Sequence, residues 1–162
     1  MNGLKTRILA LLLSFTALFA GCDTKDDNPA SPNNPSCSAN GGIFLSARID
    51  NLTWCADSTL NGALSGSLAV SGASSGNSRT ISIMLDDLSP GTYSAKFSRN
   101  KFQYTDNGTV YQSTNTNPGS ITITEHNTSL NFVTGTFLVT LNNNTAGDKT
   151  LSNGSFKVYY TE

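Results

Sequence analysis

The sequence predicts an all-β fold, and two observations carry that prediction. Apolar and polar residues alternate in short runs, which is the period of a half-buried strand rather than of a helix. These runs are rich in β-branched and aromatic residues and are bounded by Gly, Asn, Asp or Pro. We therefore expect a single antiparallel β-sandwich or closed β-barrel of about 8–10 short strands, and the sequence does not decide between these two architectures.

The expected strands follow one another along residues 43–162. Glycine followed by Ser or Thr and an apolar residue recurs where strands begin, because glycine supplies the positive φ of a turn. Residues 61–71 are rich in Ser, Gly and Ala and predict a thin strand, after which residues 72–78 predict a loop. The clearest alternating runs are residues 43–49, 81–85, 121–123, 137–141 and 156–160.

Two local signals refine this pattern. Asp106-Asn107-Gly108 lies between two apolar runs and predicts a two-residue hairpin turn, because Asn-Gly suits a turn with positive φ at both positions. Gly135 lies inside a longer apolar stretch, where we expect a bulge or a close backbone contact instead of a strand break.

The N-terminus has the pattern of a secretory signal. Lys5 and Arg7 precede an apolar stretch over residues 8–20, which is shorter than the about 20 residues that a membrane-spanning helix needs. Its end, Ala20-Gly21-Cys22, resembles the lipobox of bacterial lipoproteins, although Phe19 stands where leucine is more usual. The resemblance implies cleavage after residue 21 and acylation of Cys22, and several acyl chains would hold the protein firmly on a membrane.

The residues after Cys22 predict a tether. Residues 23–42 are mainly Asp, Asn, Pro, Ser and Gly and cannot bury a core, so we expect residues 22–42 to be a disordered link to an all-β domain at residues 43–162. Lys25, Asp26 and Asp27 resemble the surface-export signal of Bacteroidota lipoproteins. This resemblance implies an outer-membrane lipoprotein that faces the cell exterior.

The remaining cysteines form an even pair. With Cys22 lipidated, Cys37 and Cys55 can form a disulfide bond in an oxidising compartment. Closing a loop of this length would stabilise the fold by about 3 kcal/mol on the chain-entropy description. The alternative is two unrelated thiols, with Cys55 buried.

Charge and motifs argue against nucleic-acid binding and against catalysis. Ten basic and eleven acidic residues leave no basic patch for nucleic acid. His126 is the only histidine and is expected in a solvated turn. Residues 72–76 match a nucleophile elbow only by letter. Glu125 and Asp106 lack the spacing of a glycosidase pair. Asp86-Asp87 lacks a calcium-loop pattern. We expect no enzyme, metal site or cofactor.

The aromatic residues indicate a contact surface. Phe102, Tyr104 and Tyr111 flank the predicted Asn107-Gly108 hairpin, where they could stack on a sugar ring or contact a protein partner. Trp54, Phe97 and at least one of the tyrosines, in contrast, are expected to fill the core.

The domain as a whole resembles a known family. The resemblance rests on short pieces that occur in order: residues 44–51 with Trp54, 90–93, 119–123, 135–137 and 153–156. In these pieces the domain resembles small Bacteroidota lipoproteins catalogued only as a domain of unknown function. This resemblance implies an all-β lipoprotein domain but no activity.

Three function classes follow from these expectations. A non-catalytic binding or envelope-associated module fits best, because an anchor, a tether and a β scaffold are predicted without a catalytic constellation. A fimbria-like structural assembly subunit is the second possibility, and it would exchange a strand between subunits. A hydrolase is the third. The partners expected for the first class are the membrane, through the N-terminal lipid, and a glycan or protein ligand.

Overall fold

The all-β prediction is confirmed. The computed structural model describes residue 37, residues 42–57 and residues 59–162, and this part contains eleven strands, slightly more than expected. A 3-10 turn, η2, spans Ser75–Asn77. The strands are β1 (Phe44–Ile49), β2 (Leu52–Cys55), β3 (Thr59–Ser65), β4 (Ser67–Ala73), β5 (Arg79–Leu85), β6 (Gly91–Ser94), β7 (Lys101–Asp106), β8 (Thr109–Ser113), β9 (Gly119–Asn127), β10 (Phe132–Asn143) and β11 (Gly147–Tyr159).

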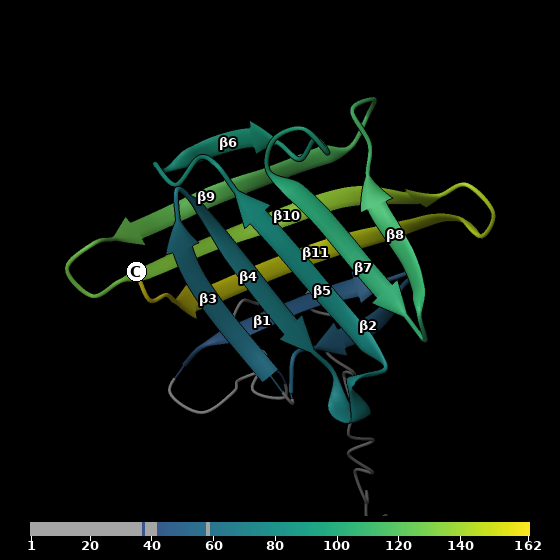
Figure 1. Cartoon of the computed structure of the whole chain (residues 1–162), viewed down its shortest axis with the longest axis horizontal. Coiled ribbons are helices and arrows are strands. Elements are labelled where there is room, and N and C mark those ends of the chain that lie inside the picture. Colours follow the sequence, from purple (N-terminus) through teal and green to yellow (C-terminus); the bar gives the residue numbers. More distant parts are fainter. Residues whose placement is uncertain (1–36, 38–41, 58) are drawn as a thin grey trace, which may run out of the picture.

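One strand, β10, belongs to two layers of the same antiparallel sheet. One edge of β10 pairs with β11 from end to end. Its other edge pairs with β9 as far as Val139 and then with β8 at Leu141 and Asn142. The first layer therefore has the order β6-β9-β10-β11-β1-β2, and the second continues from β8 through β7, β5 and β4 to β3. Figure 1 shows the second layer crossing over the first as the sheet curls.

The chain's end brings the two layers together again on the other side. Thr161 forms a parallel bridge with Ala63 of β3. The Leu64 amide donates to the Thr161 carbonyl at 2.8 Å, and the Thr161 amide donates to the Gly62 carbonyl at 3.2 Å. The result shares features of both predicted architectures: two packed layers, as in a sandwich, that belong to one curled sheet, as in a barrel.

The core lies between the layers and follows the predicted alternation. In β5, Ile81, Ile83 and Leu85 are buried, whereas Met84 faces solvent. Trp54 is buried as expected. The largest fully buried side chains are Trp54, Tyr104, Phe102, Phe156, Leu45, Leu68, Ile81, Ile83, Leu85, Ile121, Ile123 and Leu141.

Gly135 occupies a bulge, as the sequence predicts. The β9–β10 register shifts between Thr134 and Gly135. A Cβ atom at Gly135 would lie 2.6 Å from the Thr122 carbonyl oxygen and 2.8 Å from the Phe156 ring. Because real Cβ atoms do not approach so closely, the absent side chain makes room for this ring where β10 bends.

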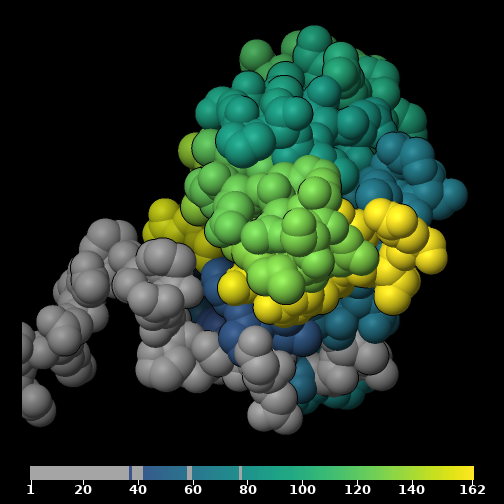
Figure 2. Space-filling view, turned by 90° about the vertical axis from the view of Figure 1, so that its left-hand side faces the viewer, coloured from purple at the N-terminus to yellow at the C-terminus, as the bar shows by residue number. Residues whose placement is uncertain are grey.

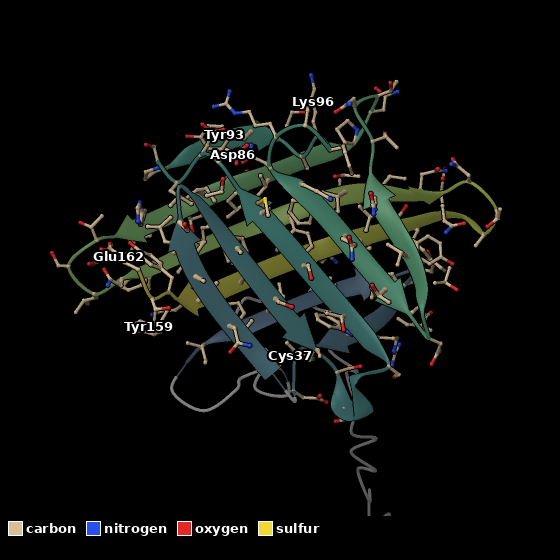
Figure 3. The ribbon with its side chains drawn as sticks, in the orientation of Figure 1. Cys37, Asp86, Tyr93, Lys96, Tyr159 and Glu162 are labelled. Atoms are coloured by element: carbon tan, nitrogen blue, oxygen red, sulfur yellow. A yellow bond between two sulfur atoms is a disulfide. The ribbon has the colours of Figure 1, made fainter. Side chains whose placement is uncertain are left out.

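Two further local predictions are confirmed. Asn107 and Gly108 have φ values of 47° and 86° and connect the paired residues Asp106 and Thr109, as a two-residue hairpin requires. Cys37 and Cys55 form a disulfide bond, with their Cα atoms 5.2 Å apart. Cys37, labelled in Figure 3, thereby fixes the chain ahead of β1 to the end of β2.

Residues 59–78 are more regular than expected. They form the strands β3 and β4 and the short turn η2, in place of one thin strand and a loop. Residues 72–76, which match a nucleophile elbow by letter, run from the end of β4 into this turn. Within the described residues, no helix is long and apolar enough to cross a membrane.

The prediction that Phe102, Tyr104 and Tyr111 form an exposed contact surface is wrong. Phe102 is 0% exposed, Tyr104 1% and Tyr111 6%. The Tyr104 and Tyr111 rings stack on paired positions of β7 and β8, with centroids 6.0 Å apart. On β7, Phe102 and Tyr104 alternate with Lys101 and Gln103, which point outward, so the aromatic face packs into the core.

The buried Tyr104 predicts a loss of stability in alkaline solution. Burial raises the pKa of its hydroxyl to about 12 from a usual value of 10.0, and the Asp106 carboxylate adds to this increase. The unfolded chain would release this proton near pH 10 and the folded chain only near pH 12. The contribution of Tyr104 is therefore complete below pH 10 and is lost as the pH rises through this window.

We expect the free energy of unfolding to fall less steeply between pH 10 and 12 in Tyr104→Phe than in the wild type. Urea titrations at several pH values would measure both slopes. Tyr159→Phe is the matched control, because the Tyr159 side chain is 46% exposed and its substitution should leave the slope unchanged. Equal slopes in all three proteins would contradict the assignment.

Candidate functional site

Three connections between the layers meet at one end of the molecule and line two adjoining surface hollows. The connections are residues 86–90, 95–100 and 114–118. One hollow, of about 330 Å³, is lined by Asp87, Tyr93, Ser94, Lys96, Arg99 and Asn100. The other, of about 520 Å³, is lined by Ser94, Lys96, Asn115, Thr116, Asn117, Pro118 and Gly119. We call them the loop-end hollows; Figure 3 labels Tyr93 and Lys96 at this end.

A buried amide holds the first hollow together. Asn100 is 2% exposed and has a φ of 54°, a conformation that Asn tolerates better than most residues. Its Oδ1 accepts hydrogen bonds from the Asp86 and Asp87 amides at 3.0 and 3.4 Å. Its Nδ2 donates to Asp87 Oδ2 at 3.3 Å and to the Ser94 carbonyl at 3.5 Å. One side chain thus connects residues 86–90 to the end of β6 and the start of β7.

Two opposite charges lie on the wall of this hollow. The Arg99 guanidinium donates to Asp87 Oδ1 at 2.6 Å, and the Arg99 side chain remains 62% exposed. A solvent-exposed ion pair contributes little to stability, so its effect here is mainly to orient the two side chains. The Lys96 carbonyl accepts a hydrogen bond from the Arg99 amide at 3.1 Å and so closes a tight turn. The Lys96 side chain is exposed at this turn.

The second hollow is fixed to the first through backbone groups. The Phe97 amide donates to the Thr114 carbonyl at 3.2 Å, and the Ser98 amide donates to Asn115 Oδ1 at 3.1 Å. These bonds place residues 114–118 beside residues 95–100. The side chains of Thr116 and Asn117 remain exposed at the surface of this hollow.

Aromatic rings lie at this end as well. The half-buried Tyr93 contributes to the wall of the first hollow, and its hydroxyl donates to the Ser89 carbonyl at 2.9 Å. Phe97 is 46% exposed, so the prediction that it fills the core is wrong. The Lys101 ammonium lies 4.4 Å from the centre of the Phe97 ring. Hydroxyl, amide, cationic and aromatic groups therefore occur together at one end of the domain.

A second candidate site lies on the outer face of the second layer. This hollow, of about 340 Å³, is lined by Asn61, Ala63, Ala69, Val70, Ser71, Ser82, Ile83, Met84, Lys101 and Gln103. We call it the sheet-face hollow. Its lining is mostly apolar, with small side chains of β3 and β4 beside Met84 of β5 and the longer side chains of β7. Figure 2 shows the molecule from another side, with β9 and its neighbours in green beside the end of β11 in yellow.

The only histidine lies in a strand and not in a solvated turn. His126 is in β9, is half-buried, and its Nε2 lies 2.9 Å from the Tyr160 hydroxyl in hydrogen-bond contact. Tyr160 is itself buried. In the part of the chain that the structure describes, no group of three or more His, Cys, Asp or Glu side chains is arranged to hold a metal ion.

The sequence does not single out the loop-end hollows, although it contains two signals for them. Lys96, Arg99 and Lys101 place three cations within six residues, next to the exposed Phe97. Asn115 and Asn117 follow in another turn. Of the remaining predicted site residues, Cys22, Lys25, Asp26 and Asp27 lie outside the described part of the chain.

The fold defines an all-β domain made from one curled antiparallel sheet. A family described as Domain of unknown function (DUF6252) matches residues 43–158, so the chain belongs to this family. The match begins just before β1 and ends within β11, and thus includes both layers and the loop-end hollows. The predicted membership of an uncharacterised domain family is confirmed. No curated protein and no solved structure matches the chain.

The roles of Asn100 in backbone conformation and in hydrogen bonding can be separated by two substitutions. Asn100→Gly removes the amide but permits positive φ, whereas Asn100→Ala removes the amide and also strains the backbone. We expect each to lower the free energy of unfolding by at least about 1–3 kcal/mol, because the partly buried Asp86 and Asp87 amides lose their acceptor. The Ala variant should lose roughly 1 kcal/mol more than the Gly variant. Denaturant unfolding would measure both.

Asn107→Ala is the matched control for that experiment, since Asn107 also has positive φ but lies exposed at the tip of the β7–β8 hairpin. It should show the backbone cost without the loss of a buried network. If Asn100→Gly were as stable as the wild type, the amide would not hold the first hollow together.

Proposed function

We propose that this protein is a lipid-anchored surface protein whose all-β domain is a non-catalytic binding module, and that the loop-end hollows bind a glycan. One observation carries the proposal. Side chains from three separate connections line two adjoining hollows, and the buried Asn100 holds the first of them through bonds to backbone groups and to Asp87. Binding sites gain affinity when their polar groups are positioned before the ligand arrives.

The chemistry of the lining favours a sugar over an apolar ligand. Ser94, Thr116 and Asn117 present hydroxyl and amide groups that can both donate and accept hydrogen bonds, as sugar hydroxyls do. Tyr93 adds a ring on which a sugar can pack. The sheet-face hollow is largely apolar and has fewer such groups.

The N-terminal sequence supports the attachment and the location that we propose. Cys22 would carry the lipid, and residues 23–42 would form a polar tether to the domain. Lys25, Asp26 and Asp27 would direct the lipoprotein to the outer face of the outer membrane. A binding module held on such a tether could reach ligands outside the cell.

Replacement of Lys25, Asp26 and Asp27 by alanine tests the location. We expect the domain to be degraded by added protease on intact wild-type cells but protected in the triple variant, with both proteins in the membrane fraction. Alanine replacements of Ser31, Asn33 and Asn34 in the same tether are the control and should leave the domain accessible. Accessibility of the triple variant would contradict the export assignment.

Blocking substitutions test the binding site. Ser94 is exposed and lines both loop-end hollows, whereas Ser71 is exposed and lines the sheet-face hollow. We expect wild type and Ser71→Trp to bind the same glycans on an array, and Ser94→Trp to bind them at least tenfold more weakly in solution titrations, because its ring fills the hollows. Circular dichroism would verify that both variants are folded.

The opposite pattern, with loss only in Ser71→Trp, would move the site to the sheet face. Binding of no glycan by the folded wild-type protein would overturn the proposed ligand class.

A further inference from the structure

We infer that the glycan bound by the loop-end hollows is acidic, and that Lys96 binds its anionic group. This inference rests on the proposed function and adds the chemical class of the ligand. The shared chemistry is a carboxylate or a sulfate on a sugar ring. The argument depends on how the charges at this end of the molecule are paired.

Lys96 differs from the other lysines in the described part of the chain. The Lys149 ammonium pairs with the Asp50 carboxylate at 2.5 Å. The ammonium groups of Lys101 and Lys157 lie over the rings of Phe97 and Phe132, at 4.4 and 4.6 Å. Among the described residues, only the Lys96 ammonium has neither a carboxylate nor an aromatic ring against it, and Lys96 lines both loop-end hollows.

The nearby acidic groups are already engaged. Asp87 accepts from Arg99 at 2.6 Å and from the Asn100 side chain at 3.3 Å. Asp86 accepts from the neutral Ser67 hydroxyl at 2.6 Å and keeps its negative charge, but it does not line either hollow. Asp87 therefore balances Arg99, while Lys96 leaves one uncompensated positive charge in the lining of the hollows. A single anionic group on the ligand would balance it.

Arg99 can assist in binding this group. One of its terminal nitrogens holds Asp87, but a guanidinium has five N–H donors, and the side chain is 62% exposed. Planar N–H pairs suit carboxylate and sulfate oxygens. The hydroxyl and amide groups of Ser94, Thr116 and Asn117 remain for the neutral hydroxyls of the sugar. Cationic and neutral donors thus lie side by side, as an acidic sugar requires.

Paired glycans that differ only in charge test this inference. The probes are oligogalacturonate, a hyaluronan oligosaccharide and a chondroitin sulfate oligosaccharide. Each is compared with its neutral counterpart, which is methyl-esterified and, for chondroitin sulfate, also desulfated. We expect titration calorimetry of the wild-type protein in 50 mM NaCl to show at least tenfold tighter binding of an acidic probe than of its neutral form. The difference should shrink in 500 mM NaCl, because salt screens exposed charges.

Charge-matched variants assign the effect to Lys96. Lys96→Gln should bind the acidic and neutral forms alike, whereas Lys157→Gln changes the net charge equally on β11 and should keep the preference. Tighter binding of the carboxylate probes alone would identify a carboxylate as the anionic group, and tighter binding of the sulfated probe alone would identify a sulfate.

Equal binding of acidic and neutral probes by the wild-type protein would overturn the inference and leave glycan binding intact. An acidic preference that persists in Lys96→Gln would overturn the assignment to Lys96. If an array detects only neutral glycans that Ser94→Trp fails to bind, the inference fails while the proposed function holds. Absence of all glycan binding would overturn both.

Discussion

The structure depends on the double pairing of β10. One edge of this strand follows β11 throughout, and the other changes partner from β9 to β8 just after Val139. Because β8 and β9 cannot share one plane at that point, the sheet divides into two layers, and their apolar inner faces pack together. The bend brings aromatic rings against the backbone, where Gly135 and Gly154 make room for Phe156 and Phe137. The core and the layer order both follow from this division.

The candidate site is a consequence of the same division. The chain passes from one layer to the other between β5 and β6, between β6 and β7, and again between β8 and β9, and these three connections lie at one end. Such crossings are too long for tight hairpin turns, and their backbone groups need partners other than a paired strand. Asn100 and Asn115 supply those partners from their side chains. The exposed side chains between these fixed points then line the hollows.

Much of the fold could be predicted from the sequence because alternation directly reflects which face of a strand is buried. The hairpin at Asn107 and the bulge at Gly135 could also be predicted, since each depends on local backbone conformation. The burial of all three aromatic residues near the hairpin could not be predicted in the same way. Phe102 and Tyr104 alternate with polar residues, and this pattern indicates that their face of the strand is buried. Their proximity to a turn suggests exposure instead, and here the alternation is the correct guide. The exposure of Phe97 was missed because it lies outside any alternating run.

The site was beyond the reach of local patterns because its residues come from connections that are distant in sequence. Asparagines with positive φ mark individual turns in the sequence. Those turns lie close together in space because β10 changes its partner from β9 to β8. This separation divides the work among residues. Asn100 holds the backbone from a buried position, while Lys96 and Asn117 extend from it into the hollows. Substitution of the exposed side chains can therefore change the lining of the hollows without disturbing the core, whereas substitution of Asn100 would affect both.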